Sequence, residues 1–179
     1  MAAAGLSVSF KGDVKHIIKD LDKVQRQVVP LATAAALNKV VNKARTQVVK
    51  KVSAAKQIRP QRLIKERTYI KKATARKQTA ILNTLTAGVL VEKMNWRATK
   101  AGVKAGQHAF PHGFKATIAG NQRPMQRKGS QRLPIQKINI PIAADVDRIA
   151  RAEQRNGGRE FTKQFNHELQ FRLRRKGLL

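Results

Sequence analysis

The chain has 179 residues, no cysteine, and 38 lysines and arginines against 10 aspartates and glutamates, which gives a formal net charge of +28. This length fits one domain, and the missing thiols exclude a disulfide framework and thiolate metal sites. Because self-repulsion at such a charge opposes compaction, we expect a polyanion or an acidic protein surface as partner.

The first third of the chain predicts helices. A short strand at Leu6–Phe10 precedes a helix that Asp13 can cap and whose apolar side chains recur at the helical period as far as Val28. Pro30 either kinks this helix or opens a second one in its first turn. The second helix has a basic outer face and a narrow apolar stripe. The stripe consists of Ala34, Leu37, Val41, Ala44, Val48 and Val52.

A break and a short helix are predicted next. Ser53–Lys56 ends the long helix, and Pro60 can start a short helix that runs to about Arg67. The basic segment Lys71–Lys77 then reads as a tether. These segments keep the positive charge close to the helical part of the chain.

The polarity changes abruptly at residues 78–91, which carry no charged side chain. Ala80–Thr86 and Gly88–Val91 are expected to be paired strands joined by a turn. The section 97–133 is rich in glycine and proline, so we expect much of it to be loop, interleaved with short strands such as Phe114–Ala119.

The last part of the chain predicts one strand and two helices. Ile135–Ile140 alternates apolar and polar side chains, as a half-buried strand does. One helix is expected over Pro141–Arg155 and another over Arg159–Arg175, with Gly157–Gly158 as the break between them.

The order of elements predicts an α+β fold, with long N-terminal amphipathic helices, a small antiparallel sheet, and C-terminal helices packed on that sheet. Residues 1–179 form one domain in this interpretation. Its parts are an N-terminal helical basic region at 11–77, a β-rich core with Gly-rich loops at 78–140, and C-terminal helices at 141–179.

Residues that could perform catalysis or bind a metal are sparse. His108 and His112 stand four apart, but Pro111 between them argues against a shared helix face, so both read as loop imidazoles. Asp145 and Asp147 lie where a helix starts, and capping explains them better than acid–base chemistry does. We therefore expect no enzyme activity, no metal, no cofactor and no small-molecule substrate.

The positive charge is concentrated in the middle of the chain. Residues 39–77 hold 14 basic side chains and one acid, and residues 93–144 hold ten basic side chains and no acid. Contact with DNA and contact with an acidic partner protein both stay open, and neither would involve reading of base sequence. The predicted contact residues are Lys43, Arg45, Lys50, Lys51, Arg59, Arg62, Lys65, Arg67, Lys71 and Lys72.

Three stretches carry a resemblance to a known family. VPLATAAALNKVVNKARTQVVKKVSAAKQIRPQRLIKERTYIKKAT at 29–74, the aromatic strand at Phe110–Phe114 with Lys115–Ile118, and LPIQKINIPIA at 133–143 occur in the order found in the phage minor tail protein Z family. The chain resembles that family over about three-quarters of its length.

The resemblance implies a non-enzymatic structural protein of the virion, a tail completion or neck subunit at the head-proximal end of the tail. It implies a closed homo-oligomeric ring, with six subunits favoured over twelve. The expected neighbours are the tail terminator, the tail tube or the head connector, with phage DNA as a further partner.

A second interpretation comes from charge and size alone, which also fit a cellular nucleic-acid-binding protein of ribosomal or nucleoid type. The Ala-rich helical start and the order of motifs favour the phage protein. No apolar run approaches the roughly 20 residues of a membrane span, and the start lacks a secretory pattern, so we expect assembly in the host cytoplasm and no membrane contact.

Overall fold

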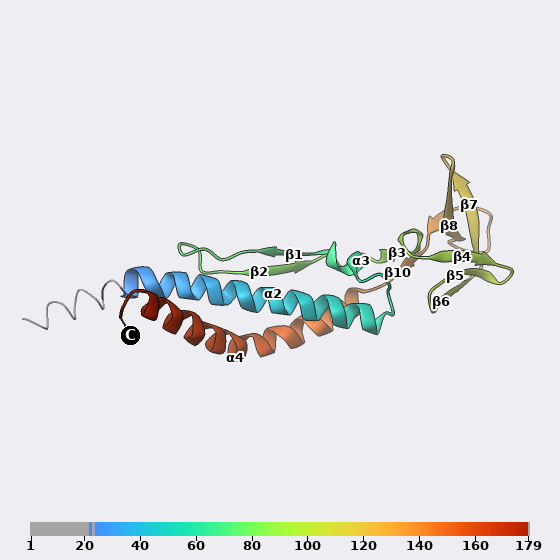
Figure 1. Cartoon of the computed structure of the whole chain (residues 1–179). Helices are drawn as coiled ribbons and strands as arrows, with labels where there is room; N and C mark the ends of the chain where they lie inside the picture. The colour runs from blue at the N-terminus through green and yellow to red at the C-terminus, as the bar shows by residue number, and fades with distance from the viewer. Residues whose placement is uncertain (1–21, 23, 179) are drawn as a thin grey trace, which may run out of the picture. The chain divides into compact units, whose positions relative to one another are not determined.

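The structure, a computed structural model, describes residues 22 and 24–178 of the chain (Figure 1). The predicted α+β class is confirmed, since long helices flank a series of short strands. The helical elements are the π-helical turn η1 (Val24–Val28), α2 (Val29–Ala55), α3 (Arg62–Lys65), the 3₁₀ turn η2 (Val91–Lys93) and α4 (Ala143–Arg175). The strands are β1 (Thr68–Lys71), β2 (Ile81–Thr84), β3 (Val89–Leu90), β4 (Trp96–Thr99), β5 (Gly102–Ala105), β6 (His108–Pro111), β7 (Gly113–Ile118), β8 (Asn121–Arg127), β9 (Ile135–Lys137) and β10 (Asn139–Ile140).

The chain divides into two compact units. We call the first the helical unit, made of the described residues of Met1–Val40, Lys72–Ala80 and Arg159–Leu179. The second, the β-rich unit, is made of Val41–Lys71 and Ile81–Gly158. Because α2 and α4 each cross a boundary between these ranges, each long helix contributes one part to each unit.

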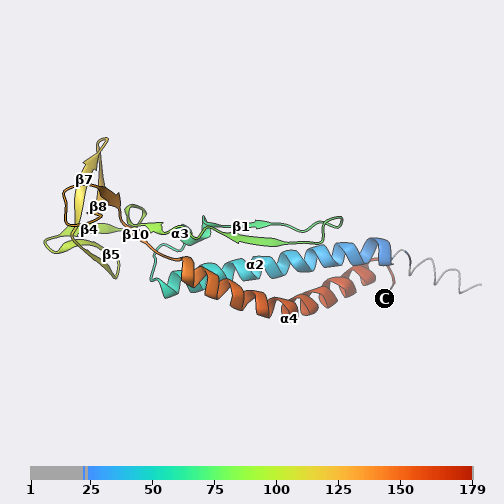
Figure 2. The ribbon, with the colours of Figure 1, turned by 180° about the vertical axis from the view of Figure 1, so that it is seen from behind.

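The helical unit contains one segment of α2 and one of α4, and these two segments run side by side in Figures 1 and 2. Val28, Ala32 and Ala36 are fully or almost fully buried, and the small alanines allow close helix approach. Lys39 Nζ lies 2.6 Å from a carboxylate oxygen of Glu168, whose side chain is only 9% exposed. The hydrogen bond from Lys39 holds the pKa of Glu168 below its usual value.

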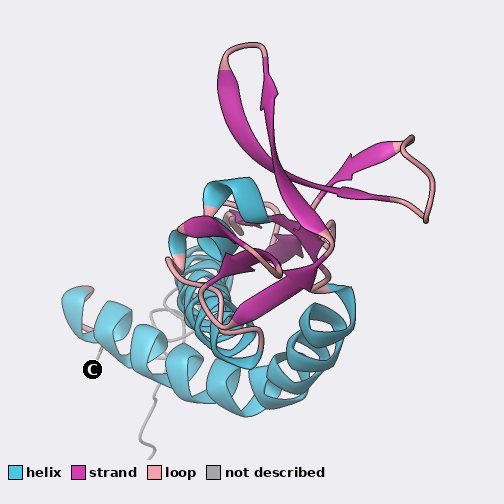
Figure 3. Cartoon of the chain, turned by 90° about the vertical axis from the view of Figure 1, so that its right-hand side faces the viewer, coloured by secondary structure: helices cyan, strands magenta, loops and turns pink. Residues whose placement is uncertain are grey.

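The β-rich unit contains a single apolar cluster that joins its helices to its strands. Val48 and Val52 of α2 pack there with Val146 and Ile149 of α4. The strands and their connections supply Val89, Val91, Val103, Ala105, Ile138 and Ile140. Figure 3 distinguishes the strands from the helices by colour.

The predicted pairing of Ala80–Thr86 with Gly88–Val91 is wrong. β2 pairs instead with β1, in a register that places Thr68 opposite Thr84 and Lys71 opposite Ile81. β3 pairs with β10, which comes some fifty residues later. The sequence pattern identified the uncharged strand segments, but β1 consists of TYIK inside a basic run, and the charged residues around it hid its strand character.

The section 97–133, much of which was predicted to be loop, contains more strand than expected. Antiparallel strands β4, β5 and β6 form one sheet, and β7, β8 and β9 form another. Gly106 and Gly120 lie in hairpin turns, whereas Gly102 and Gly113 are the first residues of β5 and β7. Gly102 has φ +135°, and a Cβ on it would lie 2.2 Å from the carbonyl oxygen of Phe110, so the cross-strand approach requires glycine. The strand expected at Phe114–Ala119 is β7, displaced by one residue.

The two expected C-terminal helices are one helix, α4, that continues through Gly157 and Gly158. Two interior glycines cost about 1 kcal/mol each relative to alanine, and packing along both halves of the helix outweighs that cost. Phe161 and Phe165 of this helix stack with ring centroids 5.7 Å apart.

Three further expectations concern element ends. The half-buried strand at Ile135–Ile140 is divided into β9 and β10 around buried Ile138, and the two halves belong to different sheets. Pro30 lies in the first turn of α2, as one of the two alternatives predicted. The strand at Leu6–Phe10 and the helix start at Asp13 lie outside the described residues.

Candidate binding site at the end of helix α2

Helix α2 ends in a Schellman motif that creates the base of a cavity. The backbone amide of Ile58 donates to the carbonyl of Ser53 at 2.9 Å, and the amide of Gln57 donates to the carbonyl of Ala54 at 3.1 Å. Gln57 has φ +47°, the left-handed conformation that such a helix end requires and that glycine usually supplies. Ile58 is fully buried and anchors the turn in the apolar cluster.

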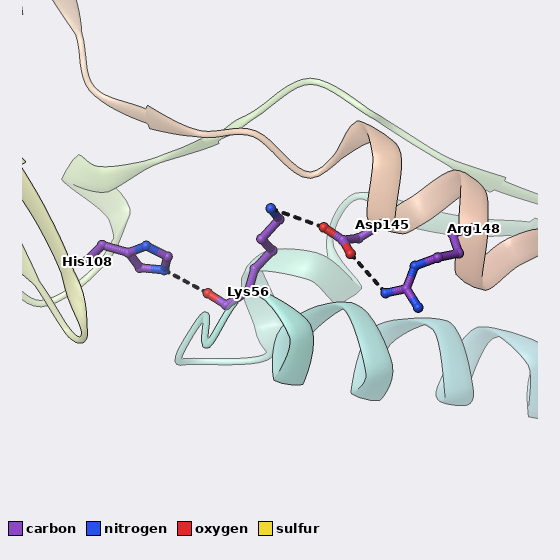
Figure 4. Close-up of polar contacts among 4 residues, drawn as sticks. All are labelled: Lys56, His108, Asp145 and Arg148. Atoms are coloured by element: carbon purple, nitrogen blue, oxygen red, sulfur yellow. Dashed lines mark hydrogen bonds and ion pairs between the residues drawn. The ribbon is translucent and has the colours of Figure 1, made fainter.

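Lys56 joins this helix end to two other elements of the β-rich unit (Figure 4). The Nε2–H of His108, in β6, donates to the backbone carbonyl of Lys56 at 2.7 Å. The ammonium of Lys56 lies 3.1 Å from Asp145 in the first turn of α4, and Arg148 donates to the same carboxylate at 3.0 Å. These hydrogen bonds, first that of Arg148 and then that of Lys56, lower the pKa of Asp145.

The prediction for one of these side chains, His108, needs correction. His108 was expected to be a loop imidazole, but it is a strand residue whose ring bonds a helix end; His112 follows β6 with φ +64°. Asp145 does lie in the first turn of α4, and its carboxylate pairs with cations there. Asp147 is paired with Arg151 at 2.9 Å.

A cavity of about 700 Å³ opens beside the end of α2, within the β-rich unit. Two of its lining side chains are cationic, four are amides, and three are apolar. The lining residues are Lys50, Ser53, Ala54, Gln57, Ile58, Arg59, Gln61, Met94, Asn95, Gly106 and Gln107. A site of this size with an apolar base and several polar groups has the usual character of a ligand or side-chain pocket.

The cations of the cavity are unneutralised. Lys50 and Arg59 are exposed, and neither has a salt-bridge partner among residues 22 and 24–178. Ser53 also lines the cavity. It is only 4% exposed, and its Oγ has no hydrogen-bond partner in the structure. A buried hydroxyl normally has a partner, so the unpaired Oγ of Ser53 is unusual in a folded chain.

Among the ten predicted contact residues, Arg45, Lys51 and Arg67 are engaged within the fold of the β-rich unit. Lys51 Nζ lies 2.5 Å from Glu153, Arg45 donates to the carbonyl of Lys65 at 3.2 Å, and Arg67 donates to the carbonyls at 87 and 88 at 2.7 and 3.0 Å. Their charges therefore help to position α3 and the strand connections around them.

The other predicted contact residues lie in several places. Lys50 and Arg59 come together at the cavity, while Arg62 and Lys65 are exposed on α3. The remaining exposed residues are Lys43 on α2, Lys71 at the end of β1, and Lys72 in the helical unit.

The neutral side chains of the cavity were missed by sequence reasoning. Ser53 follows the apolar stripe of α2, but nothing in the pattern indicates that its hydroxyl is buried without a partner. Gln107 lies in a hairpin turn of the section 97–133, where much loop was expected, and Asn95 lies just before β4, where no element was predicted. The runs of basic residues in the sequence identified only Lys50 and Arg59 among the residues that line the cavity.

Neither a metal cluster nor a transmembrane helix is seen in the described part of the chain. No three His, Cys, Asp or Glu side chains at residues 22 and 24–178 are placed to share a metal ion. Over the same residues, no helix combines the length and apolar character needed to cross a lipid bilayer.

Comparison with known proteins gives consistent matches. The family described as Prophage minor tail protein Z (GPZ) matches residues 10–176 of this chain. A tail completion protein of Escherichia phage N15 is 29% identical over 152 residues, which cover 78% of this chain and 82% of that protein. Tail completion protein Z of Escherichia phage lambda is 26% identical over 189 residues, which cover 93% of this chain and 97% of that protein. No solved structure matches the chain.

Proposed function

Because the chain belongs to the prophage minor tail protein Z family, we propose that it is a ring-forming neck subunit that completes the head-proximal end of a phage tail and joins it to the head connector. A structural role in tail completion rests on the family and on the relatives from phages N15 and lambda. The structural character of this family also argues against a catalytic role.

One observation carries the proposed contact with a partner: the exposed positive charge of the β-rich unit is not balanced within it. Lys50, Arg59, Arg62 and Lys65 are exposed along α2, α3 and the segment between them. Lysines and arginines crowded in this way repel one another unless an anionic surface covers them. The proposed contact surface also includes Lys43, Arg45, Lys51, Arg67, Lys71 and Lys72.

The proposed assembly is a closed ring of six subunits rather than twelve, since a ring on a tail tube is expected to share the tube's symmetry. Its neighbours would be further copies of the chain, the tail terminator, the tail tube or the head connector, with phage DNA in the channel. The subunit would be assembled in the host cytoplasm and retained in the virion, with no membrane or small-molecule partner.

The test is charge reversal at three exposed positions, Arg59→Glu, Arg62→Glu and Lys65→Glu, in the phage that encodes the chain. We expect a folded protein and a loss of infectious particles, because the anionic partner would be repelled. A matched variant, Lys93→Glu with Lys100→Glu and Lys128→Glu, changes the net charge equally at other exposed sites. Normal titres from the first variant, or equal losses from both, would contradict the assignment.

Ring formation and DNA contact have separate tests. Native mass spectrometry and a reconstruction of the intact neck should give a closed ring; a monomer in the particle would contradict it. DNA binding should weaken steeply as salt is raised, because each neutralised phosphate releases counterions. A flat response to salt would favour an acidic protein partner.

The +28 charge also fits a cellular nucleic-acid-binding protein of ribosomal or nucleoid type. Mass spectrometry of purified virions separates this alternative from the proposed function. A tail subunit should be present at a fixed number of copies per particle, whereas a host nucleic-acid-binding protein should be absent or variable.

A further inference from the structure

We propose that the cavity at the end of α2 receives an acidic side chain from a segment of a partner protein, with Lys50 and Arg59 binding its carboxylate. This inference rests on the proposed function and narrows it, because it separates one protein-binding pocket from the wider basic surface. The partner is defined by its chemistry: a peptide segment with an aspartate or glutamate beside apolar and amide-bonding groups.

The size of the cavity favours a peptide. About 700 Å³ accommodates a few side chains or a small molecule and is much too small for a double helix, whose major groove alone is about 12 Å wide. A concave site also differs from a flat basic face, since the occupant must be able to enter it. A loop or a chain end of a protein meets this requirement.

The chemistry of the lining also favours a peptide over a nucleotide. Apolar Ala54, Ile58 and Met94 lie beside amides that can pair with a peptide backbone. None of the described lining residues is aromatic, so the cavity has no surface on which a base could stack. Phosphates gain little from an apolar base, whereas the methylene groups of a glutamate would be buried there.

Two polar features of the cavity wall are unexplained by the fold alone. Ser53 lines the cavity and its buried Oγ has no hydrogen-bond partner, so this hydroxyl could donate to a carboxylate once its side chain rotates toward the cavity. Gln57 occupies a left-handed position that glycine would occupy at lower cost, and its side chain lines the cavity. Both features make sense if these groups bind an occupant.

The binding site is held rigid by the contacts of Lys56 (Figure 4). Lys56 precedes Gln57, and its hydrogen-bond partner His108 follows Gln107, so the Lys56–His108 bond at 2.7 Å fixes two opposite parts of the lining. A preorganised site loses less conformational entropy when a segment binds.

The experiment measures binding of an end-blocked heptaglutamate peptide to the full chain by calorimetry, at about 0.3 M salt so that exposed charges are screened. Ala54→Trp should fill the cavity without a change in charge and weaken binding about tenfold. Ala55→Trp is the matched control, since Ala55 is the exposed next residue and does not line the cavity; it should change affinity less than about twofold.

A charge variant gives an independent measurement if the tryptophan disturbs folding. Lys50→Gln with Arg59→Gln should weaken binding at least about tenfold, because two charge-assisted contacts are lost. Arg127→Gln with Lys128→Gln removes the same charge at exposed positions outside the lining and should have little effect. Equal effects of the two charge variants would mean general attraction and would overturn the proposal.

The remaining outcomes are also decisive. No heptaglutamate binding by the unaltered chain, or equal binding by the two tryptophan variants, overturns the pocket. Preferential binding of heptathymidylate that is lost in Ala54→Trp assigns the cavity to nucleic acid instead. If the peptide experiments contradict the pocket while the charge reversal of Arg59, Arg62 and Lys65 still abolishes infectivity, the proposed neck function stands. If the charge-reversal variant is fully infectious, the wider contact surface is contradicted, whatever the peptide experiments give.

Discussion

The ammonium of Lys56 lies 3.1 Å from the carboxylate of Asp145, and this ion pair ties the end of α2 to the start of α4 in the β-rich unit. The backbone carbonyl of Lys56 accepts a hydrogen bond from His108 in β6. One residue thus joins three elements that are distant in sequence. The arrangement of the cavity wall depends on these contacts more than on any element by itself.

Replacing His108 by alanine should lower the free energy of unfolding by about 1 kcal/mol or more, because the Lys56 carbonyl loses its donor and the ring leaves Phe110. His108→Gln keeps an N–H donor and should retain part of the stability. Urea denaturation of the three proteins checks this order. Equal stability of the alanine and glutamine variants would show that the hydrogen bond is unimportant.

Acid should weaken the β-rich unit through Asp145. Arg148 and then Lys56 lower the pKa of this carboxyl in the folded chain, below the ordinary 3.8. Its contribution is therefore complete above the unfolded pKa and is lost as the pH falls through the lower folded pKa. Asp145→Asn should lower the free energy of unfolding by about 0.5–1 kcal/mol at pH 7. This difference between the two proteins should disappear in acid, where Asp145 is protonated. Urea denaturation across pH 7 to pH 3 measures this; parallel stability curves for the two proteins would contradict it.

Sequence patterns predicted helices better than strand pairing. The apolar stripe that includes Val48 and Val52 identified the buried face of α2, because helical periodicity is a local property. The pairing of β3 with β10 depends on contacts across fifty residues, which no local pattern contains. The basic residues around β1 hid that strand, and glycines between β4 and β6 made real strands look like loop.

The candidate site was predictable only through its charges. Lys50 and Arg59 belong to the basic run at 39–77, but that run also contains Lys51 and Arg67, which are used inside the fold. Whether a lysine is paired depends on an acid elsewhere in the chain, such as Glu153 for Lys51. The neutral part of the lining comes from three distant segments and becomes visible only in three dimensions.

Glu168→Gln should destabilise the helical unit by about 1–2 kcal/mol, because the almost buried carboxylate that binds Lys39 and also pairs with Arg172 is removed. Lys39→Met should cost less, since Lys39 is half exposed and Arg172 still neutralises the acid. A double-mutant cycle from urea denaturation isolates the pair. A coupling energy near zero would show that the 2.6 Å contact contributes nothing to stability.

Alanine at Gly157 or Gly158 should raise the free energy of unfolding by about 0.5–1 kcal/mol at each position. Both glycines lie inside α4, and an added Cβ would have no atom within 4 Å at either one. Gly102→Ala is the opposite case, since its Cβ would collide with the carbonyl of Phe110, and that variant should lose stability. Thermal denaturation checks the order; destabilisation by alanine at 157 or 158 would indicate that a bend in α4 is needed there.

Gln57→Gly should separate stability from binding. Glycine adopts the left-handed conformation at φ +47° without the Cβ clash, so the free energy of unfolding should rise by about 1 kcal/mol. The same change removes an amide from the cavity wall, so heptaglutamate affinity should fall. Gln57→Asn is the control, because asparagine tolerates this conformation and keeps an amide. A glycine variant that is both more stable and fully competent in binding would show that Gln57 has no part in the site.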